Sequence, residues 1–156
     1  MDFQPGQASQ FPTVGRWSIT VVPRGWIFAA GFGIRQMSME PNAVVASVGL
    51  VEDAVESEHG LIAYLGKQKE LIGGYLKEPA FAGPQPIAFP GADEAQLFFI
   101  RHTVEPAGQM LHAQTYVRSG LWLGIITLTS QQAQVSVIRP DYDAFVKGLR
   151  ILQPPR

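Results

Sequence analysis

Residues 109–128, QMLHAQTYVRSGLWLGIITL, form two runs rich in strand-forming residues, separated by Ser119-Gly120. β-Branched, aromatic and other apolar residues favour a pleated, half-buried surface. A glycine inside a two-residue connection supplies the backbone conformation that a tight hairpin needs. The stretch therefore predicts two antiparallel strands, over 109–118 and 121–129, and an antiparallel sheet built around them.

The sequence on either side of this hairpin predicts further strands and two helices. Apolar residues at helical spacing predict one helix from about residue 57 to residue 76, with Ser57 as its N-cap. A second helix is expected to begin near Pro140 and to bury Tyr142, Phe145, Val146 and Leu149. Period-two or β-branched runs predict the other strands at 17–21, 26–30, 34–40, 43–51, 87–89 and 95–105.

This order of elements predicts the fold class. Strands, a helix, more strands and a last helix are typical of an α+β protein with a single antiparallel β-sheet flanked by two main helices. Residues 131–138 fit either a helix or a strand. We expect a single domain over 14–152, a flexible N-terminal arm over 1–13 and a frayed tail over 153–156.

Composition excludes several functional classes. The 156 residues carry 12 basic and 13 acidic side chains, and the basic ones are scattered, which argues against nucleic-acid binding. The absence of cysteine excludes disulfides and thiolate-bound metals. The apolar run 121–128 is far shorter than the ~18 residues of a membrane span, so we expect no membrane insertion. The polar start at Met1 lacks a secretory signal pattern, and we expect a cytoplasmic protein.

One face of the hairpin is unusual for a solvent-exposed surface. A turn at Ser119-Gly120 pairs Arg118 with Leu121, and one face then mixes apolar and hydrogen-bonding side chains. That face consists of Met110, His112, Gln114, Tyr116, Leu121, Leu123, Ile125 and Thr127. It is either an ordinary sheet face, partly covered by the N-terminal arm or the proline-rich loop, or a surface kept apolar for a protein partner.

The three histidines do not form a metal site in this register. The register places Arg101 opposite His112 and sends His102 to the other face, although a turn slipped by one residue would bring these two histidines together. A third ligand is missing in either case, because His59 falls in the first turn of the predicted helix. We therefore expect no metal and no cofactor.

No arrangement of residues predicts catalysis. No serine lies in a Gly-x-Ser-x-Gly elbow with a plausible histidine and acid. Gly31-Phe32-Gly33 lacks the later glycine and the strand–turn–helix context of a dinucleotide fingerprint. The acidic residues 52–58 are accounted for by favourable charge at a helix N-terminus. We expect a protein that is not an enzyme.

Several features follow one another in a definite order along the chain. An early strand ends in Pro23-Arg24-Gly25-Trp26, and an apolar strand leads into an amphipathic helix. Residues 91–95, Gly-Ala-Asp-Glu-Ala, open a strand that precedes the glutamine-rich hairpin 109–128, and the closing helix ends in Gly-Leu-Arg-Ile at 148–151. In this order the features resemble the PsbP/DcrB-like superfamily, which shares its fold with the Ran-binding protein Mog. The likeness covers residues 14–152, and it implies an α/β/α sandwich.

Within this superfamily, the cytoplasmic bacterial branch is that of the effector-associated (Eag) chaperones of type VI secretion. Residues 109–117, followed by Gly120-Leu121-Trp122, are similar to their central hairpin. The resemblance implies a homodimeric adaptor that holds the transmembrane-type helices of an effector against an apolar sheet face. The alternatives are a module that binds a soluble folded partner, as the Ran-binding relative does, and a DcrB-like protein of another role. A small-molecule cleft near 79–92 is a third possibility.

Overall fold

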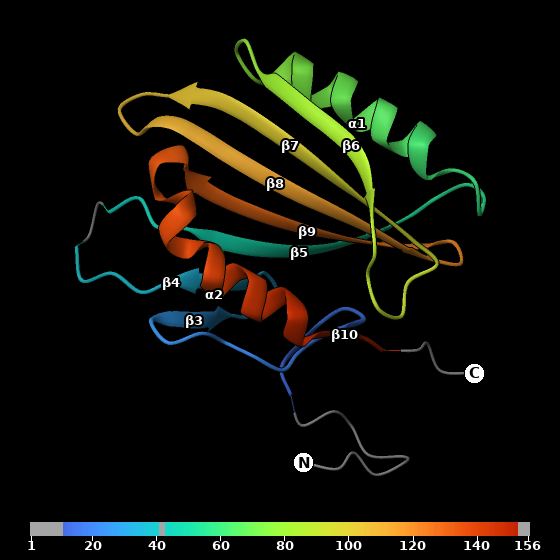
Figure 1. Ribbon diagram of the computed structural model, residues 1–156, viewed down its shortest axis with the longest axis horizontal. Coiled ribbons are helices and arrows are strands. Elements are labelled where there is room, and N and C mark those ends of the chain that lie inside the picture. The colour runs from blue at the N-terminus through green and yellow to red at the C-terminus, as the bar shows by residue number, and fades with distance from the viewer. Residues whose placement is uncertain (1–10, 41–42, 153–156) are drawn as a thin grey trace.

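The computed structural model of the chain describes residues 11–40 and 43–152, and its centre is a large antiparallel sheet (Figure 1). Seven strands lie in the order β3-β4-β5-β9-β8-β7-β6, and every neighbouring pair is antiparallel. These strands are β3 (Trp26–Ala29), β4 (Gly33–Gln36), β5 (Ser47–Ala54), β6 (Ala80–Ile87), β7 (Glu94–Val104), β8 (Gly108–Ser119) and β9 (Trp122–Gln131).

Two helices lie on opposite faces of this sheet (Figure 1). Helix α1 (Leu61–Tyr75) lies behind the β6–β7 edge of the sheet. Helix α2 (Val135–Gly148) lies in front of the other half of the sheet and follows the short 3-10 helix η1 (Gln132–Gln134). We refer to the α1 face and the α2 face of the sheet. The α+β class, the antiparallel sheet and the two helices are confirmed.

The prediction of a single sheet is wrong. A second sheet of three strands, β1 (Thr13–Val14), β2 (Trp17–Ile19) and β10 (Leu149–Ile151), has the order β1-β2-β10. The ends of the chain meet in it, because β10 directly follows α2 and pairs with β2. Thr13, expected in the arm, pairs with Ser18, whereas residues 1–10 and the tail 153–156 lie outside the described residues.

The α2 face carries the larger core. Trp17 and Ile19 from the small sheet and Phe145 from α2 are almost completely buried against strands of the large sheet. Trp26 on β3 donates its indole N–H to Oδ2 of Asp141 on α2 at 3.0 Å, which ties the helix to that edge of the sheet. This core therefore combines one helix, a second small sheet and the centre of the large sheet.

The α1 face carries a smaller core. Leu61 and Leu65 of α1 pack against a patch of the sheet that consists of residues on β7, β8 and β9. The buried strand residues in this patch are Phe98, Ile100, Tyr116, Leu123 and Ile125. Phe81 of β6 stacks on Phe98 at a centroid distance of 5.6 Å and closes the edge.

The register of the β8–β9 hairpin differs from the predicted one. Ser119 pairs with Trp122 and Arg118 with Leu123, so the two-residue loop is Gly120-Leu121 rather than Ser119-Gly120. Gly120 has a positive φ of 61° at the first loop position, where a tight hairpin turn favours glycine. The shift is two residues along one strand, so the side chains expected to share a face still do so.

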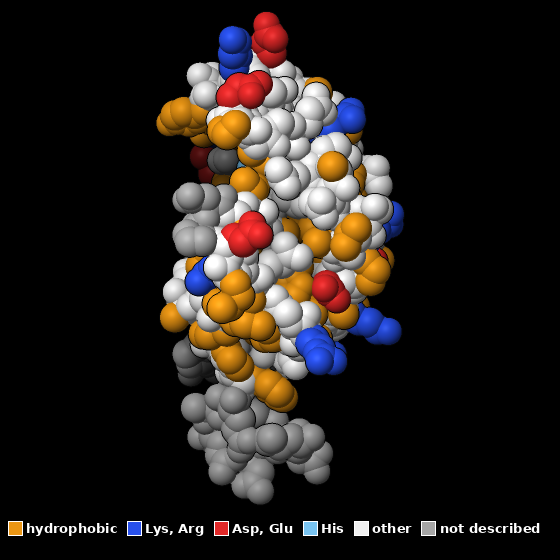
Figure 2. Space-filling view, turned by 90° about the vertical axis from the view of Figure 1, so that its left-hand side faces the viewer, with side chains coloured by type: hydrophobic (Ala, Val, Ile, Leu, Met, Phe, Trp, Pro, Cys, Tyr) orange, Lys and Arg blue, Asp and Glu red, His pale blue; other side chains and the backbone are white. Residues whose placement is uncertain are grey.

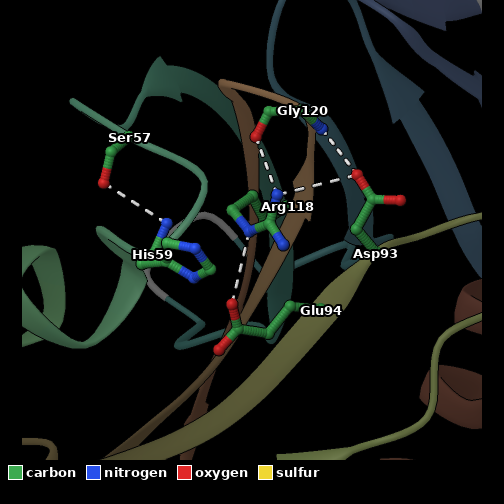
Figure 3. Close-up of polar contacts among 6 residues, drawn as sticks. All are labelled: Ser57, His59, Asp93, Glu94, Arg118 and Gly120. Atoms are coloured by element: carbon green, nitrogen blue, oxygen red, sulfur yellow. Dashed lines mark hydrogen bonds and ion pairs between the residues drawn. The ribbon is translucent and has the colours of Figure 1, made fainter.

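A polar cluster fixes the end of this hairpin (Figure 3). The Arg118 side chain is only 10% exposed, and it donates from Nε to Glu94 at 3.3 Å and from Nη1 to the carbonyl oxygen of Gly120 at 2.9 Å. Asp93 accepts the Gly120 N–H at 2.7 Å and lies 3.6 Å from the guanidinium. The cluster joins the β8–β9 turn to the start of β7 and satisfies its own charges.

Three further predicted boundaries are wrong. The proline-rich segment forms the eight-residue strand β6 instead of a short strand at 87–89, because an edge strand tolerates prolines that lack a sheet-facing N–H. Helix α2 begins at Val135, so Pro140 lies inside it; buried Ile138 favours the added turn despite one lost hydrogen bond. Helix α1 has Gly60, not Ser57, at its N-cap. In the described part of the chain, neither helix has the length and apolar character needed to cross a membrane.

Candidate functional site

Among residues 11–40 and 43–152, helix α1 covers only part of its face, and these residues leave the rest as an uncovered floor of mixed chemistry. Side chains at odd positions of β5 and β9 and at even positions of β8 lie on this face. Beyond the α1 core they include exposed Val51 and the half-buried polar side chains of Gln114 and Thr127. Phe32 covers Gly49 of β5, because its ring lies 3.2 Å from the position that a Cβ would take there. We call Phe32, Val51, His112, Gln114 and Thr127 the open floor.

The flank of α1 borders this floor. Tyr64 of α1 donates its hydroxyl to Asp53 of β5 at 2.6 Å, whereas Lys69 lies 5.4 Å above Phe81 of β6. The Tyr64 side of the helix therefore faces β5, and the Lys69 side faces the β6 edge. Residues at i+7 and i+11 from Tyr64 lie on the same flank. These are Leu71, which is 53% exposed, and Tyr75, which is 83% exposed.

The eight residues predicted as a partner surface fall into three groups. Tyr116, Leu123 and Ile125 are buried in the α1 core, and Leu121 is exposed in the β8–β9 turn. His112, Gln114 and Thr127 are only partly buried and belong to the open floor. Met110 is 8% exposed near the other end of β8. The structure thus brings the polar members of the set together and covers most of the apolar ones with the chain's own helix.

The polar groups around the open floor are linked to one another. Tyr116 donates its hydroxyl to Oε1 of Gln114, so this bond occupies the amide oxygen of Gln114 and not its N–H groups. Burial raises the pKa of the Tyr116 hydroxyl, so it stays a hydrogen-bond donor near neutral pH. Burial, and then the carboxylate of Asp53, raise the pKa of Tyr64 as well.

A pair of histidines joins this floor to its neighbourhood, contrary to the predicted register: His112 belongs to the floor, and His102 lies next to it. His112 is opposite Ile100, not Arg101, so His102 and His112 lie on the same face. Their Nε2 atoms are 2.8 Å apart, and Nδ1 of His112 lies 3.1 Å from Oγ1 of Thr129. Burial, and then the neighbouring His102, lower the pKa of His112, which favours its neutral form.

Sequence reasoning missed the apolar part of the open floor and its helical border. Val51 ended a β-branched run that predicted a well-buried strand. Leu71 had no role in the predicted helix, and Tyr75 was one of two candidates for the last position of its apolar stripe, although it is 83% exposed. The signal for Val51 was its position two residues from Gly49, since alternate residues of a strand share a face. Phe32 carried no such signal, because its place over Gly49 depends on a loop.

Among the hollows elsewhere in the described residues, one of about 430 Å³ lies at the start of α1, where Tyr64 bonds Asp53 and Lys67 lies 3.9 Å from Glu56. Another of about 220 Å³ lies between α2 and the sheet and has Phe99 and Tyr142 in its lining. In the first, the polar groups satisfy one another, and the second is mostly apolar. Neither joins a nucleophile to a base.

The end of the molecule where β4 leads into β5 exposes further apolar side chains. Figure 2 views this end and shows hydrophobic side chains gathered in its lower half. Met37, Met39 and Val44 lie in the loop between these strands and are 58%, 99% and 48% exposed. Val21 and Val22, in the loop before β3, are each 38% exposed. This loop surface is a second candidate for contact with a partner.

Comparison with known proteins identifies the fold but not a family. No family model and no curated protein matches the sequence. Among solved structures, LpqN of Mycobacterium tuberculosis, a protein involved in cell envelope biogenesis, has a TM-score of 0.66 at 13% identity, over 88% of this chain and 84% of LpqN. PA94 of Pseudomonas aeruginosa, a protein of unknown function, has a TM-score of 0.60 at 20% identity, over 78% of this chain and 81% of PA94.

The third similar structure is a PsbP protein, and PsbP is part of the superfamily that the sequence pattern resembles. The cyanobacterial PsbP (CyanoP) of Synechocystis has a TM-score of 0.59 at 11% identity, over 90% of this chain and 89% of CyanoP. The chain therefore has a PsbP-like fold, as the order of its elements predicted. At these identities the likeness establishes the fold alone, and the function must be argued from the surfaces described above.

Proposed function

We propose that this chain is a non-catalytic adaptor that binds an apolar helix of a partner protein on the open floor, alongside α1. The observation that carries the proposal is the combination of exposed Val51 and Phe32 on the floor with exposed Leu71 and Tyr75 on the bordering flank of α1. Together they give a floor and one wall of apolar side chains. Burial of such surface stabilises a complex by ~25 cal/mol per Å².

The floor favours a helix over an added strand. Strands β5, β9 and β8 lie in the interior of the sheet and are paired on both sides, so their backbone groups are already satisfied. An occupant must therefore pack its side chains on this face, as α1 itself does. A second helix beside α1 would complete the same layer at the usual 8–10 Å spacing between helix axes.

The polar residues of the floor fit an occupant that carries some hydrogen-bonding groups. The Gln114 amide and the Thr127 hydroxyl lie among apolar neighbours and are only partly buried. A polar group of the partner that is desolvated there costs about 1–3 kcal/mol if it finds no hydrogen bond. These two side chains supply such bonds, so the floor accepts a helix with occasional serine or threonine residues.

The resemblance to the effector-associated chaperones supports a specific form of this proposal. In that form the occupant is a transmembrane-type helix of a type VI secretion effector, the chain acts in the cytoplasm, and two copies form a homodimer. Apolar helices of this kind need cover in water, and the open floor with its helical wall offers it. Nothing in the arrangement calls for a cofactor, a metal or a nucleic acid in this role.

A labelled synthetic helix of leucine and alanine with lysine ends, titrated with the full chain, tests the proposal by fluorescence anisotropy. Val51→Asp should weaken binding by about tenfold or more, because an unpaired carboxylate would be buried under the helix. Val137→Asp is the matched control, since Val137 is 69% exposed on α2 and lies on the other face. Equal affinities of both variants and the unchanged chain would contradict the proposal.

A second candidate is a module that binds a folded protein through its loops. The exposed side chains of Met37, Met39 and Val44 favour it, because methionine adapts to irregular partner surfaces. Met39→Asp separates the two functions. Under the first proposal this variant binds the synthetic helix normally, whereas under the second it loses its partner and Val51→Asp retains it.

A further inference from the structure

The pair His102–His112 has a geometry suited to a shared ion. The ring planes are within 13° of parallel and the ring centroids are 5.0 Å apart, while the two Nε2 atoms are separated by 2.8 Å. The centroid distance exceeds the nitrogen distance by about one ring diameter. The rings therefore meet edge to edge with their nitrogen atoms facing each other.

The outer nitrogen of His112 is held in the way that metal-binding histidines are held. Nδ1 of His112 lies 3.1 Å from Oγ1 of Thr129 on β9. If Nδ1 carries the hydrogen of this bond, Nε2 of His112 has a free lone pair, which accepts the Nε2–H of His102. Metal-ligating histidines bind with one nitrogen while the other donates to an oxygen, which fixes the ring and its tautomer.

An ion in place of that hydrogen requires the two rings to separate. The ring centres and the facing nitrogen atoms lie close to one line, so two metal–imidazole bonds of about 2.0–2.1 Å would hold these nitrogens roughly 4.1 Å apart. Starting from 2.8 Å, His102 and His112 must therefore move apart by about 1.3 Å in total. Both side chains are only partly buried, so an ion can enter from solvent.

A third side chain with a metal-binding atom, the thioether of Met110, lies next to the two histidines. It is directly opposite His102 on the neighbouring strand and two residues before His112 on β8, so all three side chains lie on the α1 face. Directly opposite side chains in an antiparallel pair have Cβ atoms about 4.5–5.5 Å apart. No group of three His, Cys, Asp or Glu residues within 11–40 and 43–152 suits a metal ion, so the thioether decides the chemistry of this site.

We propose that His102, His112 and Met110 form a binding site for copper(I). Thioether sulfur is a soft ligand that selects Cu(I), and imidazole also binds copper well. The site adjoins the open floor and shares His112 with it, whereas His102 and Met110 lie outside the floor. His102→Ala therefore separates the two proposals, because it should weaken copper binding and leave the binding of the synthetic helix unchanged.

Anaerobic titration of the full chain with Cu(I), in competition with bicinchoninate, tests this site. One equivalent should bind, and His102→Ala and His112→Ala should each lower the affinity by at least about tenfold, as loss of one ligand does. His59→Ala and the double variant Met37→Leu/Met39→Leu are controls, because these residues lie outside the site. Unchanged affinity in the His102 and His112 variants, or loss of binding in either control, would overturn the proposal.

Met110→Leu tests the choice of metal, because leucine keeps the volume of the side chain and removes the sulfur. It should weaken Cu(I) binding while leaving any binding of Zn²⁺ unchanged. X-ray absorption at the copper edge should show a sulfur neighbour in the unchanged chain and none in Met110→Leu. Copper bound without a sulfur neighbour, or Zn²⁺ bound more tightly than Cu(I), would refute the copper(I) assignment.

Discussion

The two faces of the large sheet are both apolar at their centres, yet they are covered in different ways. The α2 face is covered by a helix and by the three-stranded sheet, with Trp17 and Phe145 completely buried between them and the strands. In the described part of the chain the α1 face is covered by one helix, which packs over β7, β8 and β9 near the β6 edge. Beyond it Val51 is 54% exposed and Phe32 46% exposed.

This difference separates structural from binding chemistry. A face covered twice has no room for a partner, so its side chains can be uniformly apolar and closely packed. A face covered in part must keep its exposed portion acceptable to water, and it does so with Gln114, Thr127 and the two histidines. The polar residues among apolar ones, which made this face unusual in sequence, mark the boundary of α1.

The largest expected effects come from truncating one buried side chain of each helix. Phe145→Ala should lower the free energy of unfolding by about 3–5 kcal/mol, because it empties the doubly covered core. Leu65→Ala in α1 should cost about 2–3 kcal/mol, since this core is smaller and lies nearer to solvent. Urea denaturation measures both values. A larger loss for Leu65→Ala would mean that α1, not α2, carries the stability of the fold.

Two glycines on neighbouring central strands offer a sharper comparison. A Cβ on Gly124 of β9 would lie 2.5 Å from the buried Trp17 ring, whereas a Cβ on Gly49 of β5 would lie 3.2 Å from the half-exposed Phe32 ring. Gly124→Ala should therefore cost about 1–3 kcal/mol through overpacking. Gly49→Ala should change stability by less than ~0.5 kcal/mol, because Phe32 can move. Thermal unfolding of both variants checks this, and similar losses would show the α1 face to be as closely packed as the α2 face.

The smallest expected difference in stability is between the loss of one hydrogen bond on the α2 face and the loss of one on the α1 face. Asp141→Ala removes the acceptor of the indole N–H of Trp26, a side chain that is only 5% exposed, at a cost of about 1–3 kcal/mol. Asp53→Ala removes the acceptor of the Tyr64 hydroxyl, which is nearer to solvent, and should cost about 0.5 kcal/mol. Chemical denaturation at constant pH measures the two losses. Equal losses would indicate that the start of α1 is as well shielded as β3.

Much of the fold follows from local pattern. The alternation in 109–128 placed His112, Gln114, Tyr116, Leu123, Ile125 and Thr127 on one face, and this grouping withstood an error of two residues in register. Tyr142, Phe145 and Val146 of α2 face the core as their helical spacing predicted, whereas Leu149, predicted on the same helix, reaches the core as the first residue of β10. Both results depend on periodicity, which survives small errors in element boundaries.

The candidate site was only partly predictable because it depends on register and on coverage. A single-residue error in the β7–β8 register moved His102 to the wrong face and concealed its contact with His112. Tyr116 and Leu123 were expected on a partner surface, and no local feature of the hairpin indicated that α1 would cover them. Phe32 reaches its place over Gly49 through a loop.

The amino-acid sequence alone determined the class of the fold, its two helices, the hairpin at its centre and the membership of each hairpin face. Those properties depend on the period of side-chain burial, which is written into neighbouring residues. Only the tertiary structure decided how far α1 extends across its face, that the chain ends form a second sheet, and that two histidines meet beside a methionine. These outcomes arise from contacts between residues far apart in the chain, where a shift of one residue or a few ångströms changes which side chains remain exposed.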